Sequence, residues 1–163
     1  MRLSLFSDYS LRVLMYAALA EDAFQVEEVA RAYGISRNHL VKVVHNLAKL
    51  GYLETRRGRG GGIRLGRSAT EIRIGKLVRE TEGDAVLVEC FDAATNTCRL
   101  IGNCRLKGVL AEAMVAFYGR LDQQTLADLV SGNLRGRMSR VLLGGGAVGG
   151  EGEVKTAERA GRD

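Results

Sequence analysis

The order of the segments in the first half of this chain constrains its fold more than any other feature. Apolar residues recur at helical spacing between residues 8 and 18, between 26 and 33, and between 37 and 50, and a basic glycine-rich stretch follows. Gly34 lies in the short turn between the second and third segments. Two helices joined by such a turn form a helix-turn-helix, whose second helix enters the major groove of DNA. We therefore expect a mainly α fold with a small β wing, a winged helix-turn-helix.

Residues with capping chemistry predict where the helices begin and end. Ser7 and Ser36 are the expected N-caps of the first and third helices, because a serine hydroxyl accepts hydrogen bonds from the free amides of a first turn. Gly34 and Gly51 are expected to end the second and third helices. Asp122 is the expected cap of a further short helix near the end of the chain.

The basic stretch from residue 56 to 64 reads Arg-Arg-Gly-Arg-Gly-Gly-Gly-Ile-Arg, and we expect short strands at 52–57 and 62–65 on either side of its glycines. It has no lysine followed by serine or threonine and opens no helix, so it does not match a nucleotide-binding P-loop. Glycines allow backbone to approach a phosphate ridge closely, and the net charge of +5 fits a polyanion partner. The stretch is typical of a DNA-contacting wing.

The polar face of the third helix and the wing together predict a DNA-binding surface. Residues near the start of the helix are placed to reach base edges, Asn38 and His39 above all, whereas wing arginines and Lys42 suit phosphates. The expected contact residues are Ser36, Arg37, Asn38, His39, Lys42, Arg56, Arg57 and Arg59.

The second half predicts a helix that starts at residue 74 and a longer one that runs from near Cys104 to about Leu121. The longer helix carries an apolar stripe that must be buried, either on a two-fold related copy or on its own domain. We expect it to be a dimerisation helix. Its stripe consists of Leu106, Val109, Leu110, Ala113 and Phe117.

Three cysteines, Cys90, Cys98 and Cys104, are the only ones in the chain. Their odd number argues against a self-contained disulfide framework, and thiolates that converge from one loop suit a soft metal centre. A four-coordinate iron or zinc site needs a fourth donor from elsewhere. The spacing leaves an iron-sulfur cluster, a zinc site and thiol redox chemistry open.

The N-terminus has no signal-peptide pattern, and no apolar run approaches the ~20 residues that cross a bilayer. We expect a cytoplasmic protein with no membrane partner. In the cytoplasm, thiols serve more often as metal ligands than as disulfide bridges. The chain has no paired CxxC cysteines and no flavin or nicotinamide fingerprint. We therefore expect no enzyme activity.

Four strings together identify a resemblance: Ser-Asp-Tyr-Ser-Leu-Arg-Val-Leu at 7–14, Ile-Ser-Arg-Asn-His-Leu at 35–40, Arg-Gly-Arg-Gly-Gly-Gly at 57–62 and Val-Glu-Cys-Phe-Asp at 88–92. The chain resembles the nitric-oxide-sensing iron-sulfur repressors of the Rrf-type winged-helix regulator family, and the match covers about residues 1–143.

The resemblance implies a homodimer that binds a palindromic operator in double-stranded DNA and is released when nitric oxide nitrosylates its cluster. It implies one iron-sulfur cluster per subunit, 4Fe-4S rather than 2Fe-2S, ligated by Cys90, Cys98 and Cys104. Asp8 is similar to the fourth ligand of the family, which comes from the first helix of the other subunit.

The predicted elements and the change of composition after residue 143 suggest a division of the chain. We expect a winged helix-turn-helix DNA-binding domain at 1–83, an iron-sulfur cluster-binding loop at 84–105, dimerisation and C-terminal helices at 106–143 and a disordered tail at 144–163.

Three alternatives stay open. The related regulator IscR has a histidine ligand where this chain has Lys107, which argues against ligation of that type. RirA shares the cysteine spacing, so an iron-responsive iron-sulfur repressor of that kind is the first alternative. A thiol-redox or electron-transfer protein and a DNA-binding module stabilised by zinc are the other two.

Overall fold

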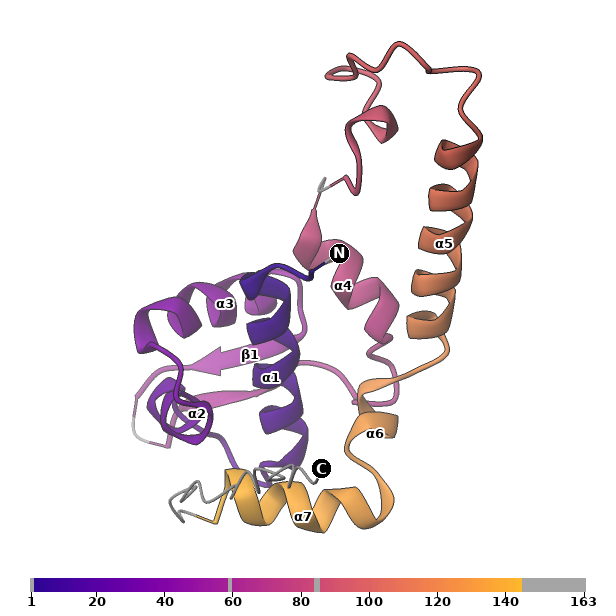
Figure 1. The fold of residues 1–163 in the computed structure, drawn as a ribbon. Coiled ribbons are helices and arrows are strands. Elements are labelled where there is room, and N and C mark those ends of the chain that lie inside the picture. The colour runs from indigo at the N-terminus through magenta and orange to yellow at the C-terminus, as the bar shows by residue number, and fades with distance from the viewer. Residues whose placement is uncertain (1, 59, 84–85, 145–163) are drawn as a thin grey trace, which may run out of the picture.

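The computed structural model describes residues 2–58, 60–83 and 86–144. The described residues are mainly helical with one two-stranded antiparallel sheet, which confirms the expected fold class (Figure 1). The winged-helix part consists of α1 (Leu5–Leu19), α2 (Val26–Tyr33), α3 (Arg37–Lys49), β1 (Leu53–Arg56) and β2 (Gly62–Leu65). It is followed by α4 (Ile74–Glu82), a 3₁₀ turn (Glu89–Phe91), α5 (Arg105–Asp122), α6 (Leu126–Leu129) and α7 (Gly132–Leu142).

Helix α1 lies at the centre of the molecule, between α2, α3 and the sheet on one side and α4 and α6 on the other (Figure 1). The core gathers around it, and Leu14, Leu40, Leu47 and Leu77 are fully buried. Burying each of these side chains contributes about 1.5–3 kcal/mol. Because α1 is surrounded, it buries Val13, Tyr16 and Ala17 as well as Leu14.

The predicted N-cap of α1 is wrong by one turn. Ser4 is the N-cap, and its hydroxyl accepts a hydrogen bond from the Ser7 amide at 3.1 Å. Ser7 lies within the helix and is fully buried. Its hydroxyl is hydrogen-bonded to the Thr81 hydroxyl of α4 at 2.8 Å. Ser36 is the N-cap of α3 as expected, but its side chain makes no capping hydrogen bond within the described residues.

Gly34 ends α2 as predicted, in the left-handed conformation with φ of 63°. Side chains other than glycine rarely adopt this φ, so the turn between the two helices depends on this residue. The amide of Ile35 then donates to the Ala30 carbonyl at 3.0 Å, which fixes the entry into α3.

The wing is an antiparallel hairpin in which Leu53 pairs with Leu65 and Thr55 with Ile63. The first strand is shorter than the expected 52–57, since Tyr52 precedes β1 and anchors its side chain in the core, whereas the second lies at 62–65 as predicted. A separate backbone bridge joins Ile63 to Phe24 in the connection between α1 and α2. The base of the wing is therefore tied to the helical body.

Helices α4 and α5 cross where Gly75 lies against Asp122. A β-carbon at Gly75 would come within 2.9 Å of the Asp122 backbone nitrogen, so only glycine permits this approach. Asp122 is the last residue of α5 and pairs with Arg79. The expectation that Asp122 caps the next helix is therefore wrong, and Thr125 caps α6 through a capping box.

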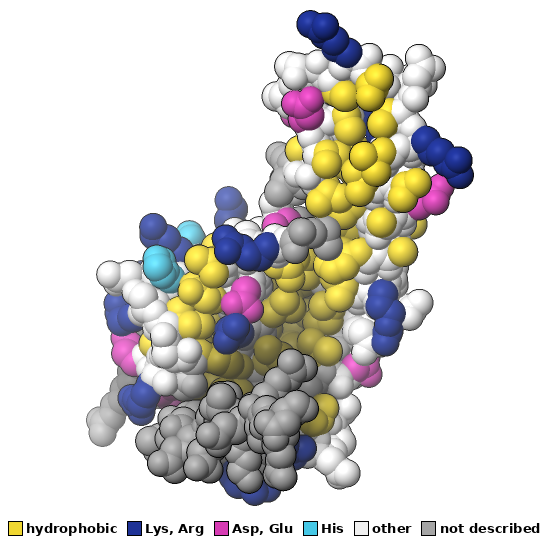
Figure 2. All heavy atoms as spheres, viewed as in Figure 1, with side chains coloured by type: hydrophobic (Ala, Val, Ile, Leu, Met, Phe, Trp, Pro, Cys, Tyr) yellow, Lys and Arg dark blue, Asp and Glu magenta, His cyan; other side chains and the backbone are white. Residues whose placement is uncertain are grey.

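Residues 86–104, here called the cysteine loop, connect α4 to α5 and extend beyond the ends of both helices, away from the winged-helix part (Figure 1). Figure 2 shows apolar side chains gathered over this end of the molecule. In the described residues, no helix is long and apolar enough to cross a membrane. Of the expected disordered tail, residues 145–163 lie outside the described residues.

Candidate DNA-binding surface and cysteine loop

Five of the predicted DNA contacts lie exposed on one side of α3, at or near its start. They are Ser36, Arg37, Asn38, His39 and Lys42. The opposite side of the helix carries Leu40, Val43 and Leu47, which are buried against the core. Because the apolar side fixes the rotation of the helix, the polar side must face outward. The structure therefore presents these five residues on a single surface, as a recognition helix requires.

Arg37 is already engaged by an acid from α2. Its guanidinium donates to the Glu27 carboxylate, and this hydrogen bond holds the pKa of Glu27 below its ordinary value. The pair is exposed, so it is weakly stabilising and can exchange with a phosphate. His39 lies near Tyr9 of α1, with 6.3 Å between ring centroids.

The wing contributes a second basic group. Arg56 and Arg57 are exposed, and the nearest acid to the Arg56 guanidinium is Glu54 at 3.9 Å. Arg59 lies outside the described residues. Arg64, which sequence reasoning left out of the contact set, is exposed on β2 opposite Glu54. Strand alternation next to the buried Ile63 is the signal that would have found it.

Arg67 shows that not every arginine near the wing is available to DNA. It donates to the carbonyls of Leu50 and Gly51 at 2.7 and 2.9 Å, and its guanidinium lies 4.6 Å from the centre of the Tyr52 ring. It closes the end of α3 onto the start of the hairpin. Its role is structural.

The structure places the three cysteines at different points of the cysteine loop. Cys90 lies in the 3₁₀ turn, the Cys98 amide donates to the Asn96 side chain at 3.1 Å, and Cys104 is the N-cap of α5. All three thiols are free and half-buried. Within the described residues, no three His, Cys, Asp or Glu side chains come together closely enough to hold a metal ion.

Asp8 lies in the first turn of α1, on the winged-helix part of the molecule. Both of its carboxylate oxygens accept hydrogen bonds from Arg12 Nε, at 3.1 and 3.0 Å, which makes an i,i+4 ion pair on α1. The Arg12 guanidinium lies 5.7 Å from the centre of the Tyr33 ring. Burial raises the pKa of Tyr33 to about 12, so the ring stays neutral beside the pair.

A polar network, absent from sequence reasoning, joins the start of α1 to the end of α4. Ser4 donates from its amide and its hydroxyl to Glu82 Oε1, at 2.8 and 3.0 Å, and Ser7 and Thr81 share a hydrogen bond at 2.8 Å. Burial raises the pKa of Glu82, but the serine hydrogen bonds lower it more, so the net pKa is below its ordinary value. The turn that carries Asp8 is thereby fixed to the helix that leads into the cysteine loop.

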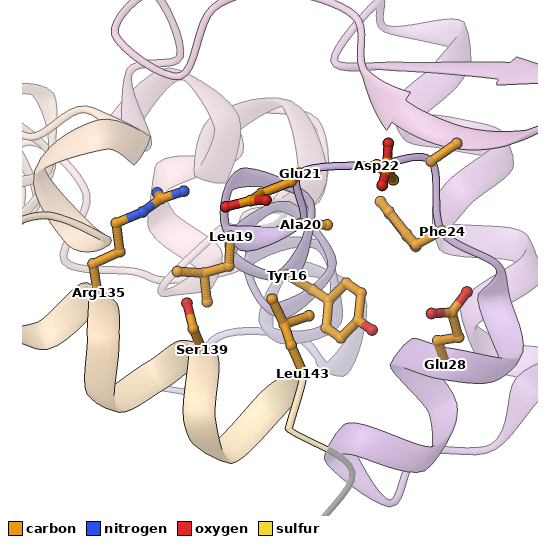
Figure 3. A pocket seen from close by; sticks show the side chains of 11 residues that line it. Tyr16, Leu19, Ala20, Glu21, Asp22, Phe24, Glu28, Arg135, Ser139 and Leu143 are labelled. Carbon is orange, nitrogen blue, oxygen red and sulfur yellow. The ribbon is translucent and has the colours of Figure 1, made fainter.

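A cavity of about 330 Å³ lies between the end of α1, the start of α2 and α7 (Figure 3). The carboxylates of Glu21, Asp22 and Glu28 line it, and Arg135 from α7 donates to the Ala18 carbonyl at 3.1 Å. Negative charge repels phosphate. The cavity itself, with three carboxylates and one arginine, is therefore unsuited to a phosphate.

A family model described as "Rrf2: Iron-dependent Transcriptional regulator" matches residues 3–132, which includes the winged helix, the cysteine loop and α5. The chain belongs to the Rrf2 family. It is a transcriptional regulator, and its DNA-binding surface is that of a winged helix.

Curated Rrf2 relatives support this membership over most of their length. The chain is 50% identical over 132 residues to the HTH-type transcriptional regulator NsrR of Bacillus subtilis, which covers 80% of this chain and 90% of the relative. It is 52% identical over 132 residues to NsrR of Shouchella clausii, with 80% and 89% coverage.

Solved structures of Rrf2 regulators have the same fold. T. potens IscR matches with a TM-score of 0.64 at 23% identity, over 80% of this chain and 86% of that one. CymR, described as the global cysteine regulator of B. subtilis, matches with a TM-score of 0.63 at 23% identity, over 79% and 95%.

Proposed function

We propose that this Rrf2 regulator is a nitric-oxide-responsive repressor that binds its operator as an iron-sulfur homodimer. The observation that carries the proposal is the identity of about one half, over 132 residues, to regulators named NsrR. The motifs around Asp8 and Cys90 resemble the nitric-oxide-sensing repressors of the family, and both segments lie within the matched residues.

The exposed apolar surface of α5 supports a dimer. None of its residues is buried in the single chain, and Leu106 and Val109, which belong to the predicted stripe, are 63% and 53% exposed. An apolar face of this length is unfavourable in water, and a two-fold related copy of the same helix covers it. The dimer axis then runs beside α5.

The donor set fits an iron-sulfur cluster held by Cys90, Cys98 and Cys104, three free thiols on one loop. Asp8 is the proposed fourth ligand and belongs to the other subunit, because in one chain it lies on the winged-helix part while the cysteine loop points away from it (Figure 1). When bound, the cluster supplies iron sites that react with nitric oxide. An oxygen ligand is a hard donor for such iron, so the Asp8 position is the most readily exchanged.

The polar network then connects ligation to DNA binding. Asp8 lies in the turn that Ser4 and Glu82 fix to α4, and α1 packs directly on α3. A ligand that crosses between subunits therefore fixes the separation of the two α3 helices. Half-sites in an operator lie one or more helical turns apart, so a change in that separation weakens simultaneous binding. Asp8 would be the residue through which a bound cluster holds this separation, and the constraint would be lost if Asp8 no longer bound it.

The test uses freshly purified, anaerobic protein. Iron and acid-labile sulfide are quantified, and double-stranded DNA that binds the protein is selected from a random pool. Fluorescence anisotropy then follows binding during a nitric oxide titration. We expect a brown protein with about four irons per chain that releases its selected DNA as nitric oxide is added.

The alternatives give different results in the same experiment. Release on iron chelation with no response to nitric oxide indicates an iron-responsive repressor. A cluster that is reduced reversibly with unchanged DNA affinity indicates electron transfer. A colourless, zinc-containing chain that ignores nitric oxide contradicts the proposal.

A further inference from the structure

The recognition helix α3 has one apolar side chain on its exposed side. Val41 is 40% exposed, and it is the only large hydrophobic residue that is exposed in this fully described helix. Leu40, Val43, Val44 and Leu47 are buried against the core instead. Valine is a weaker helix former than alanine or lysine, and Val41 is not buried within its own chain. Neither helix propensity nor core packing therefore explains a valine at this position.

Val41 lies within the polar surface that is expected to contact DNA. It follows Asn38 by three positions and precedes His45 by four, so these three exposed side chains form one row along α3. Arg37 lies beside this row, and its guanidinium is bound to Glu27 of α2. Asn38 and Val41 have short side chains, which allow the helix backbone to approach base edges closely. Val41 is therefore placed to touch a base when α3 enters the major groove.

The major groove offers one chemical group that suits a valine. The edges of the base pairs present hydrogen-bond donors and acceptors, and thymine alone adds a methyl group, at C5. A valine pressed against a donor or acceptor would leave that polar group without a partner, which is unfavourable. Against the thymine methyl, both partners bury apolar surface. Valine also has one strongly preferred rotamer in a helix, so its two methyl groups are held in place before DNA binds.

We propose that Val41 contacts the C5-methyl group of a thymine in each operator half-site and thereby determines sequence specificity. The inference rests on the proposed function, since the half-sites belong to the operator of the proposed dimer. Asn38 suits an adenine, whose N6 and N7 groups pair with an amide. The two residues lie three positions apart, about 4.5 Å along α3, and successive base pairs are about 3.4 Å apart. The thymine is therefore within one base step of the base that Asn38 contacts.

A scan of the thymine methyl groups tests the contact. Double-stranded DNA that binds the anaerobic protein is selected from a random pool, and each thymine is replaced in turn by deoxyuridine, which keeps the base pair and lacks the methyl group. Fluorescence anisotropy measures the Kd. We expect one thymine in each half-site whose replacement weakens binding about fourfold, and about fifteenfold when both are replaced, as for one and two buried methyl groups.

A substitution at Val41 assigns the effect to this side chain. Val41→Ser removes both methyl groups, and serine and valine have similar helix propensities, so α3 should be retained. In this variant, deoxyuridine at the sensitive positions should change the Kd by less than about twofold. Val141→Ser is the matched control, because Val141 is an exposed valine on α7, which packs on α1 and α2. It should keep the full effect of deoxyuridine.

The outcomes separate the two proposals. A parent protein that tolerates deoxyuridine at every thymine, or an equal effect of deoxyuridine in the parent and in Val41→Ser, overturns the contact. If nitric oxide still releases that protein from its DNA, the proposed function stands. A methyl effect that disappears in Val41→Ser, found in a protein that ignores nitric oxide, supports the contact and overturns the proposed signal.

Discussion

Replacing Glu82 by glutamine should destabilise the folded protein, because Glu82 joins the first turn of α1 to α4. Its Oε1 accepts two hydrogen bonds from Ser4, at 2.8 and 3.0 Å. A hydrogen bond to a charged group contributes about 1.5–3 kcal/mol, and a neutral acceptor gives about half of that. Losing half of this energy in two bonds amounts to about 1.5–3 kcal/mol. We expect a loss of about 1.5 kcal/mol, at the lower end of this range, because water screens the two part-exposed bonds.

The pH dependence has a definite sign. The pKa of Glu82 in the folded state lies below its ordinary value, since the serine hydrogen bonds outweigh the effect of burial. The carboxylate therefore stabilises the fold fully above the ordinary glutamate pKa, and this contribution is lost as pH falls through the folded-state pKa. The difference between wild type and Glu82→Gln should be constant from about pH 8 to pH 5.5 and narrow below about pH 4.

The assay is urea unfolding at one fixed protein concentration, since the unfolding midpoint of the proposed dimer would depend on concentration. A loss of this size lowers the urea midpoint by about 0.5–1.5 M. Glu54→Gln is the matched control, because Glu54 is exposed on β1 and its only ion pair in the described residues is the 3.9 Å contact with Arg56. Equal midpoints for wild type and Glu82→Gln at pH 7, or a difference that does not narrow in acid, would refute the reasoning.

Three further changes test other parts of the molecule. Gly75→Ala brings a β-carbon within 2.9 Å of the Asp122 backbone and should cost about 1–3 kcal/mol, measured as a lower thermal midpoint. Arg57→Ala should weaken binding to all DNA sequences and should reduce by about one the slope of log binding constant against log salt concentration. Arg137→Ala on α7 is the control and should leave this slope unchanged. An unaltered slope for Arg57→Ala places the wing away from phosphate. Cys98→Ala should lose iron and sulfide while remaining a folded dimer, and an undiminished iron content removes Cys98 from the ligand set.

Local chemistry made the recognition helix predictable. Gly34 is required by the turn conformation, and the apolar positions Leu40, Val43 and Leu47 fix which side of α3 faces the solvent. Both signals lie within a few residues of the element that they define. The helix-turn-helix could therefore be predicted from spacing alone.

Tertiary partners distant in sequence were not predictable. Ser4 and Ser7 are equally good caps by residue type, and the choice depends on Thr81, which is 74 positions away from Ser7. Asp122 likewise has a side chain that can cap a helix, but its carboxylate forms an ion pair with Arg79 instead. The cysteines could be recognised by type and spacing, yet their spacing does not determine which other side chain completes a site.

The backbone bridge between Phe24 and Ile63 bears on how any signal can reach DNA. The bridge joins the base of the hairpin to the connection between α1 and α2, so the hairpin and the helix-turn-helix form one rigid DNA-binding unit. A rearrangement within one such unit is therefore a poor way to lower the affinity for DNA. In the proposed dimer, the remaining degree of freedom is the orientation of one DNA-binding unit relative to the other, and a small rotation at the subunit boundary is enough to put two half-sites out of phase.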